Sequence, residues 1–329
     1  MFKAFHRAAA GEFQRIENPE RLAEICREGD GLLWVDLVVT DGEEHEVEAI
    51  LRDVFHFHPL TIEDCVSPQI DPAKLDDHGE YIFVVAQALA PYQRGKELRA
   101  VEADFYLGPN YVVSCRREEV HAIDRFRELV EKEPQPLDHS ADWLLHALLD
   151  GIVDDYLPAV DAVDEAIEEV EEEVLSRPDQ RILRQIILIK RNTLRLRRAI
   201  SPQREIMNRL SRGEFPKLVS PDHAIYFRDV YDHLVRVEYL VEALRDLADG
   251  ALNTYLSAVS NRLNEVMKVL TAAAAVFLPL TLISGIYGMN FSENQFPGFD
   301  QPWGFAVVVG AMFVIALGLL AFFRFRRWI

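Results

Sequence analysis

Residues 269–287 read VLTAAAAVFLPLTLISGIY and contain no charged side chain. A helix crosses the apolar core of a bilayer in about 20 residues. Residues 304–323 form a second uncharged run of similar length. The sequence therefore predicts two C-terminal transmembrane helices. The loop that joins them, residues 288–303, opens with Gly288-Met289-Asn290.

Positive charges flank the two runs only on the sides away from this loop. Lys268 precedes the first run, Arg324, Arg326 and Arg327 follow the second, and residues 288–303 contain neither Lys nor Arg. Positive residues stay on the cytoplasmic side of a membrane. We therefore expect a multi-pass protein of the cell (inner) membrane with both termini in the cytoplasm and the loop outside. The N-terminus, MFKAFHRAAAGEF, lacks the apolar segment of a secretory signal, which agrees with this topology.

The acidic balance of the chain narrows the classes of partner. A net charge of −19 argues against nucleic acid or anionic lipid as the main partner, because both prefer a basic surface. It is compatible with a protein that concentrates cations, and also with one whose acids only maintain solubility. Cys26, Cys65 and Cys115 are far apart and are expected to stay reduced. No nucleophile–base constellation is recognisable, so an enzyme is not expected.

The first 135 residues show the pattern of a cytoplasmic α/β domain. Runs rich in β-branched and aromatic residues predict strands, and apolar residues at three- and four-residue spacing predict helices. The predicted strands span residues 32–39, 81–89, 101–107 and 111–115, and the predicted helices span residues 44–57 and 118–133.

Two groups of polar residues in this part are candidates for function. His56 and His58, with His78, lack a matched further ligand, so a structural role is favoured over a metal site. Glu63 and Asp64 form an acidic pair, and the alternative to a functional role is that they complement a helix N-terminus.

Residues 136–268 are predicted to be helical throughout. Ser140 is expected to cap a helix that runs to residue 175 with a kink at Pro158. Its acidic second half and the basic helix over residues 179–212 should pair antiparallel through their charges. Direct metal binding is the alternative role for these acids, which are Asp161, Asp164, Glu165, Glu168, Glu169, Glu171, Glu172 and Glu173.

A third helix is predicted from about residue 221 through the first apolar run. At 1.5 Å per residue it would be on the order of 100 Å long, far more than a membrane requires. The excess forms a stalk that links the cytoplasmic part to the membrane. The predicted domains are therefore residues 1–135, residues 136–268 and a two-helix transmembrane domain of residues 269–329 with its outward loop at residues 288–303.

A mildly polar, uncharged stripe follows one face of this helix at three- and four-residue steps. Such a face is either a helix-packing seam or a pore wall built from several copies of the helix. Neutral oxygens from Asn290, Thr281 and Asn264 suit Mg²⁺, which keeps its waters. A proton relay would need ionisable groups at membrane depth, and none is present. The stripe comprises Asn264, Met267, Leu270, Ala274, Leu278, Thr281 and Gly285.

These features together resemble the CorA family of divalent-cation transporters, which carry magnesium and cobalt. The family signature is Gly-Met-Asn at the outer end of the first of two C-terminal spans, as at residues 288–290. Further segments that match the family pattern are HPLTIED at 58–64, EEEVLSRP at 171–178, YFRDVYDH at 226–233, NEVMKVL at 264–270 and the tail FRFRRWI.

The resemblance implies a homopentameric funnel in which five stalk helices line the pore. Gly288, Met289 and Asn290 would form the selectivity filter for hydrated Mg²⁺, with Met267 and Leu270 as a hydrophobic constriction. It also implies a regulatory metal site of Asp229 and the neighbouring subunit's Asp64, with Glu63 as a second-site acid. Cytoplasmic Mg²⁺ at this site would hold the pore shut.

The outer loop departs from the family pattern. It reads FSENQFPGFDQPWGF and lacks the Met-Pro-Glu-Leu that often follows Gly-Met-Asn, so only Glu293 and Asp300 remain there to attract cations. A Mg²⁺ channel that also passes Co²⁺ or Ni²⁺ is the leading hypothesis. A Zn²⁺ transporter of the same superfamily, with or without proton coupling, is the alternative, followed by a non-conducting membrane-anchored scaffold.

Overall fold

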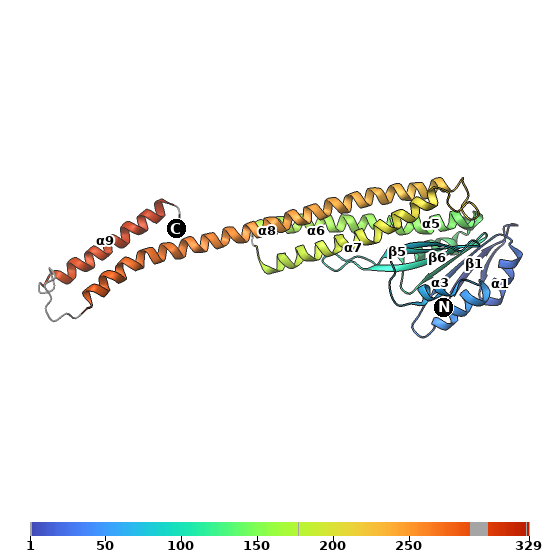
Figure 1. Ribbon diagram of the computed structural model, residues 1–329, viewed down its shortest axis with the longest axis horizontal. Helices are drawn as coiled ribbons and strands as arrows, with labels where there is room; N and C mark the ends of the chain where they lie inside the picture. Colours follow the sequence, from blue (N-terminus) through green and yellow to red (C-terminus); the bar gives the residue numbers. More distant parts are fainter. Residues whose placement is uncertain (1, 177, 290–301, 327, 329) are drawn as a thin grey trace. The chain divides into compact units, whose positions relative to one another are not determined.

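The computed structural model describes residues 2–176, 178–289, 302–326 and 328, and it divides into two compact units (Figure 1). Unit 1 is Met1–Leu252 and unit 2 is Asn253–Ile329. The boundary falls inside helix α8 (Ala224–Tyr287), so each unit is described by itself. The predicted three-part division, with boundaries at residues 135 and 268, stays a prediction.

Unit 1 contains a mixed β-sheet. Within the described residues seven strands are ordered β2-β1-β3-β7-β6-β5-β4, and neighbours are antiparallel except for the central parallel pair β3–β7. All four predicted strands are confirmed, and three more are present. The strands are β1 (Phe2–Arg7), β2 (Phe13–Ile16), β3 (Leu32–Val38), β4 (Lys74–Asp77), β5 (Ile82–Leu89), β6 (Ala100–Leu107) and β7 (Tyr111–Arg116).

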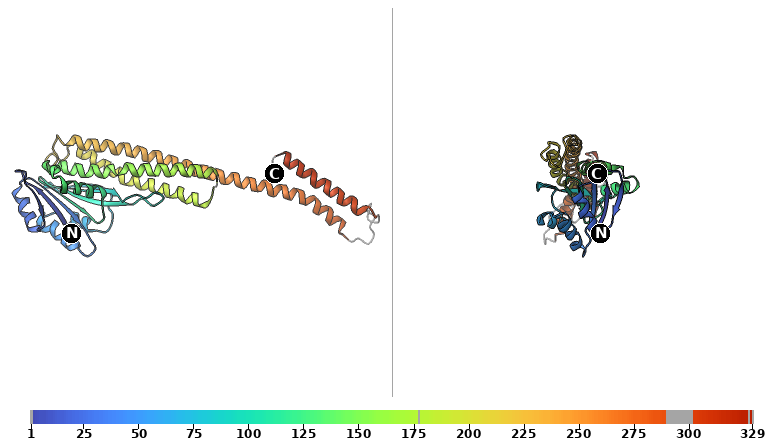
Figure 2. Two further views of the ribbon diagram at one scale, coloured as in Figure 1. Left: turned by 180° about the vertical axis from the view of Figure 1, so that it is seen from behind. Right: turned by 90° about the vertical axis from the view of Figure 1, so that its right-hand side faces the viewer.

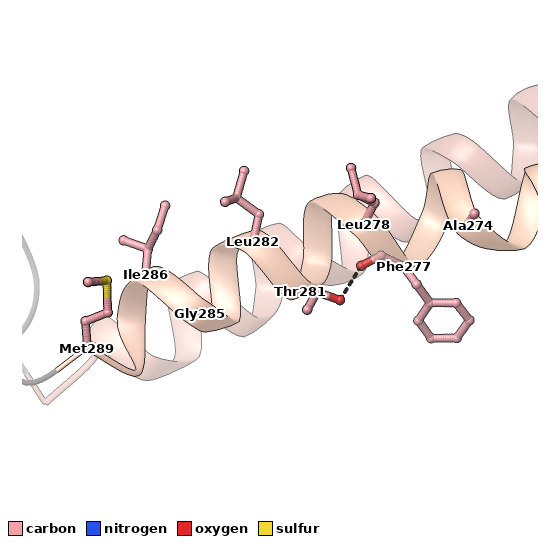
Figure 3. A pocket seen from close by; sticks show the side chains of 8 residues that line it. All are labelled: Ala274, Phe277, Leu278, Thr281, Leu282, Gly285, Ile286 and Met289. Atoms are coloured by element: carbon pink, nitrogen blue, oxygen red, sulfur yellow. Dashed lines mark hydrogen bonds between the residues drawn. The ribbon is translucent and has the colours of Figure 1, made fainter.

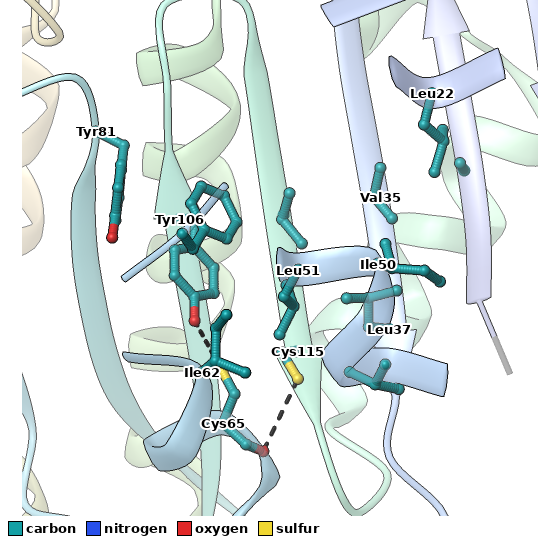
Figure 4. Packing of buried hydrophobic residues seen from close by; sticks show 14 of the residues in the cluster. Leu22, Val35, Leu37, Ile50, Leu51, Ile62, Cys65, Tyr81, Tyr106 and Cys115 are labelled. Atoms are coloured by element: carbon teal, nitrogen blue, oxygen red, sulfur yellow. Dashed lines mark hydrogen bonds between the residues drawn. The ribbon is translucent and has the colours of Figure 1, made fainter. Parts of the chain in front are cut away.

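Short helices cover one face of this sheet. They are α1 (Pro19–Glu28), α2 (Glu44–Ala49) with a π-helical turn at Ile50–Val54, and α3 (Pro59–Val66). The core between them and the sheet includes Leu22, Val35, Leu51, Ile62 and Tyr106 (Figure 4). This core holds α3, which carries the predicted acidic pair, against β6.

Longer helices cover the opposite face, where Trp34 packs on Phe126 of α4 (His121–Lys132). The predicted helix from Ser140 to residue 175 is instead two helices, α5 (Ala141–Asp154) and α6 (Tyr156–Ser176). The break is at Asp155, and Pro158 lies in the first turn of α6, where a proline is tolerated. Ser140 precedes α5 but makes no side-chain capping bond.

Helices α6 and α7 (Gln180–Ser211) lie side by side and antiparallel, as predicted (Figures 1 and 2). The predicted charge pairing between them is confirmed at one place: among the described residues the ion pair Arg181–Glu173 joins the two helices. The facing sides of the two helices are apolar, with Val163, Ile167 and Ile186 buried, and the other charges point elsewhere.

Other basic residues of α7 pair with the part of α8 that belongs to unit 1. In the described residues three ion pairs of 2.6, 3.1 and 2.6 Å connect the two helices, namely Lys190–Asp249, Arg197–Glu242 and Arg204–Glu238.

Unit 2 contains the rest of α8 and helix α9 (Gly304–Phe325). Both α8 and α9 are long and apolar enough to cross a membrane, which agrees with the prediction of two spans. Helix α8 continues through Gly250 and Pro279 without a break. The fold class is thus an N-terminal α/β unit followed by the long helix α8 and by α9. The C-terminal part of α8 and the whole of α9 are the two apolar helices.

Candidate functional site

Unit 2 presents an open groove along one side of α8 (Figure 3). The predicted pore-lining residues Ala274, Leu278, Thr281 and Gly285 all line it, so they share one helical face. Leu278 is 73% exposed in the single chain. The other lining residues are Phe277, Leu282, Ile286 and Met289.

The chemistry of this face is set by its few polar atoms. The Thr281 hydroxyl donates to the Phe277 carbonyl at 2.7 Å, which leaves the oxygen free to accept from solvent. No residue that lines the groove is charged. Asn264, Met267 and Leu270 lie further toward the N-terminus of the same helix and are exposed. The face can therefore bind water without holding a bare ion.

The predicted filter begins where α8 ends. Gly288 donates its backbone N–H to the Ser284 carbonyl at 2.9 Å and closes the last turn. A Cβ at Gly288 would lie 3.1 Å from that same carbonyl, so the close turn favours glycine. Met289 reaches back along the groove, and Asn290 lies outside the described residues.

The second candidate region is α3 in unit 1. His58 caps this helix, because its Nδ1 accepts from the Leu60 N–H at 3.2 Å, and Pro59 occupies the first turn. His78 stacks on Tyr81 at 4.8 Å between ring centroids. These contacts support a structural role for both histidines rather than a metal site.

Glu63 and Asp64 lie in the second half of α3, not in its first turn. The alternative that they complement the helix N-terminus is therefore wrong. Glu63 is exposed, whereas Asp64 is half-buried and binds Lys74 Nζ at 2.7 Å. Lys74 also contacts Asp71 at 3.3 Å. Partial burial opposes the charge on Lys74, but its two acidic partners outweigh this and raise its pKa.

Asp229, the other predicted regulatory acid, lies on α8 within unit 1 and is 71% exposed at its side chain. Among the described residues of the single chain, no hydrogen bond or ion pair joins it to Asp64. The Oδ2 atom of Asp229 lies 3.9 Å from Nε2 of His233, one turn later on α8.

His233 belongs to a cluster that sequence reasoning missed. One ligand atom each of Asp150, Asp154 and His233 lie within 4.8 Å of one another. Among the residues that the structure describes, the Oδ1 atom of Asp150 is buried without a hydrogen-bond partner. Burial, reinforced by the charge of Asp154, raises the pKa of Asp150. The four-residue spacing of the two aspartates on α5 was a signal, but the approach of α8 was not visible in the sequence.

Comparison with known proteins shows which family has this sequence pattern and architecture. A model for the CorA-like Mg²⁺ transporter protein family matches residues 29–327. The cobalt/magnesium transport protein CorA of Thermotoga maritima is 36% identical over 90% of this chain and 83% of its own length. The zinc transport protein ZntB of Pectobacterium atrosepticum is 24% identical over 76% of this chain and 75% of its own.

Solved structures show the same fold. The complete CorA magnesium transporter of Methanocaldococcus jannaschii superposes with a TM-score of 0.83 at 19% identity, over 100% of this chain and 99% of that one. The full-length CmaX protein gives a TM-score of 0.75 at 22% identity, over 99% and 97%. Given the family match, the extent of the identity and the shared fold, this chain belongs to the CorA-like Mg²⁺ transporter family.

Proposed function

We propose that this protein is a divalent-cation channel that imports hydrated Mg²⁺, and also Co²⁺ or Ni²⁺, across the cell (inner) membrane. It is a transport protein and not an enzyme. The observation that carries the proposal is the exposed, uncharged face of α8 formed by Ala274, Leu278, Thr281 and Gly285, on which the Thr281 hydroxyl oxygen can accept a hydrogen bond. Relatives named for cobalt and magnesium transport support the choice of ion.

A single chain cannot enclose a conduit with this face, so several copies are required. A homopentamer with α8 toward the axis would turn the exposed groove into a pore wall. Asn290 would rim its outer end as the filter, with both termini in the cytoplasm. Hydrated Mg²⁺ would pass by hydrogen bonds from its waters to neutral oxygens, which hold it less tightly than carboxylates.

Regulation is assigned to the acids of unit 1. Mg²⁺ prefers oxygen ligands such as carboxylates, which are supplied by the exposed Glu63 and Asp229 and by the half-buried Asp64. A bound cation would offset the repulsion between acids of neighbouring subunits and favour the closed state. Low Mg²⁺ would restore this repulsion and favour opening.

Flux into liposomes that contain the purified protein tests the transport proposal. The change Asn290→Ala removes the amide at the pore mouth, so selective Mg²⁺ flux should be lost while assembly is retained. The matched control is Asn253→Ala, which removes an exposed amide from α8. Unchanged flux in Asn290→Ala would contradict the filter assignment, and liposomes that pass no divalent metal would contradict the channel.

A Zn²⁺ transporter is the second candidate. The ZntB relatives and the Asp150–Asp154–His233 cluster favour it, because imidazole nitrogen suits Zn²⁺ better than Mg²⁺. Zn²⁺ uptake that varies with external pH, without Mg²⁺ uptake or competition, would support this function over the first.

A further inference from the structure

Two carboxyl groups inside unit 1 remain outside the function proposed above. Glu102 and Asp104 lie two residues apart on β6, so both point to the face of the sheet covered by α3. Asp104 is 2% exposed, and its Oδ1 atom has no hydrogen-bond partner in the described part of the chain. Both residues line a cavity of about 90 Å³, which is large enough to hold water.

The basic groups near this pair are already engaged. Lys74 is shared between Asp64 and Asp71, and Arg116 is bonded to acids on the other side of the sheet. Arg117, at the cavity, bonds acids near the start of α2. The titratable and charged groups that face the pair are Asp64 and Cys65 of α3, Asp71 and Lys74 before and in β4, Tyr106 of β6, and Cys115, Arg116, Arg117 and Glu118 in and after β7.

Two neighbouring carboxylates without a counter-cation are unstable in a low-dielectric interior. Binding a proton removes one of the charges. Burial raises the pKa of Asp104, and the charge of Glu102 adds to this effect. Burial also raises the pKa of Glu102 to about 7. Burial and mutual repulsion therefore both favour a bound proton on the pair.

We propose that Glu102 and Asp104 form a proton-binding site that is connected to Asp64 through Asp71 and Lys74. The contacts are continuous. The Asp71 backbone N–H donates to the Glu102 carboxylate, the Asp71 carboxylate binds Lys74, and Lys74 binds Asp64.

The charge on the pair changes the surroundings of Asp64. When the proton leaves, the added negative charge attracts Lys74 and makes the region around Asp64 more favourable for a divalent cation. Acidification has the opposite effect and weakens cation binding there. This second step rests on the proposed role of Asp64 in sensing Mg²⁺.

Infrared spectroscopy of the full-length protein without divalent metal tests the proton site directly. A protonated-carboxyl C=O absorption should disappear from the parent between about pH 6 and pH 8, around the raised pKa of Glu102. It should be absent or displaced in Glu102→Gln and in Asp104→Asn, which keep the size of each side chain. The exposed control Glu97→Gln should titrate like the parent. An unchanged absorption in both test variants would overturn the proposal.

Protease protection by Mg²⁺, measured at about pH 6 and about pH 8, tests the connection to Asp64. The protection midpoint of the parent should move to lower Mg²⁺ at the higher pH, by more than that of Glu102→Gln. Equal pH dependence in the two proteins would refute the connection. Absence of Mg²⁺ protection in either protein would count against the role of Asp64, and the infrared result without metal would still decide the proton site.

Discussion

Lys74 occupies the carboxylate to which we assign Mg²⁺ sensing, so removing its charge should strengthen cation binding. Lys74 Nζ lies 2.7 Å from Asp64 Oδ2, and the Lys74 side chain is 35% exposed. A Mg²⁺ ion bound to the same oxygen, at about 2.1 Å, would lie within about 5 Å of the ammonium group. The change Lys74→Gln removes this competitor and retains a polar side chain of similar length.

Lys74 can respond to a bound Mg²⁺ ion in two ways, and the response that costs less free energy sets the change in Mg²⁺ affinity. If Lys74 stays in place, its repulsion with a doubly charged ion about 5 Å away is about 1.7 kcal/mol in a water-like dielectric, or about 1 kcal/mol with physiological salt. If Lys74 moves away, the cost is the loss of a partly exposed ion pair, about 1 kcal/mol or less. Both routes give at most about a fivefold effect, so the Mg²⁺ midpoint should fall two- to fivefold.

Protection of the full-length protein from chymotrypsin, titrated with Mg²⁺, measures this midpoint, because chymotrypsin does not cut after lysine. Lys74→Arg keeps the charge and should behave like the parent. Lys96→Gln removes a positive charge from an exposed loop and should also leave the midpoint in place. A midpoint in Lys74→Gln that is unchanged, or displaced to higher Mg²⁺, would refute the competition.

Two further predictions concern buried charges in unit 1. Asp36→Ala should lower the free energy of unfolding by about 1.5–3 kcal/mol in denaturant titrations, because it removes the carboxylate 3.0 Å from the buried Arg116, which keeps Asp124 as its remaining partner. The control Asp41→Ala, at a side chain that is 99% exposed, should cost less than about 1 kcal/mol; equal losses would contradict the argument. The pKa of Glu102, raised from 4.5 to about 7 in the folded state, means that folding takes up a proton. Stability should therefore fall as pH rises from about 4.5 to 7, and Glu102→Gln should reduce this slope in melting curves; an equal slope would contradict it.

The membrane helices could be predicted because their signal is local. The two runs without charges locate the apolar end of α8, at residues 269–287, and helix α9. They do so without any knowledge of the elements that pack against these helices. The central strands also carried a local signal of β-branched and aromatic residues. The edge strand β4 did not, because Lys74–Asp77 is polar and depends on its pairing with β5.

Contacts between distant elements could not be predicted in the same way. The charges of α7 indicated a basic helix but not its partner, and the sequence neighbour α6 was the wrong choice for Lys190, which pairs with Asp249. The approach of His233 to Asp150 likewise depends on how α8 packs on α5. The family resemblance gave Asp64 and Asp229 as site residues, but it did not reveal that Lys74 already binds Asp64.

Helix α8 also has a consequence for biosynthesis. Its first turns complete the core of unit 1, where Phe227, Val230 and Leu234 are fully buried, and its last turns form the first apolar span. During synthesis, the segment that completes the core of unit 1 is therefore followed directly by the first apolar segment, within the same helix. Targeting to the translocation machinery should overlap in time with the final folding step of unit 1.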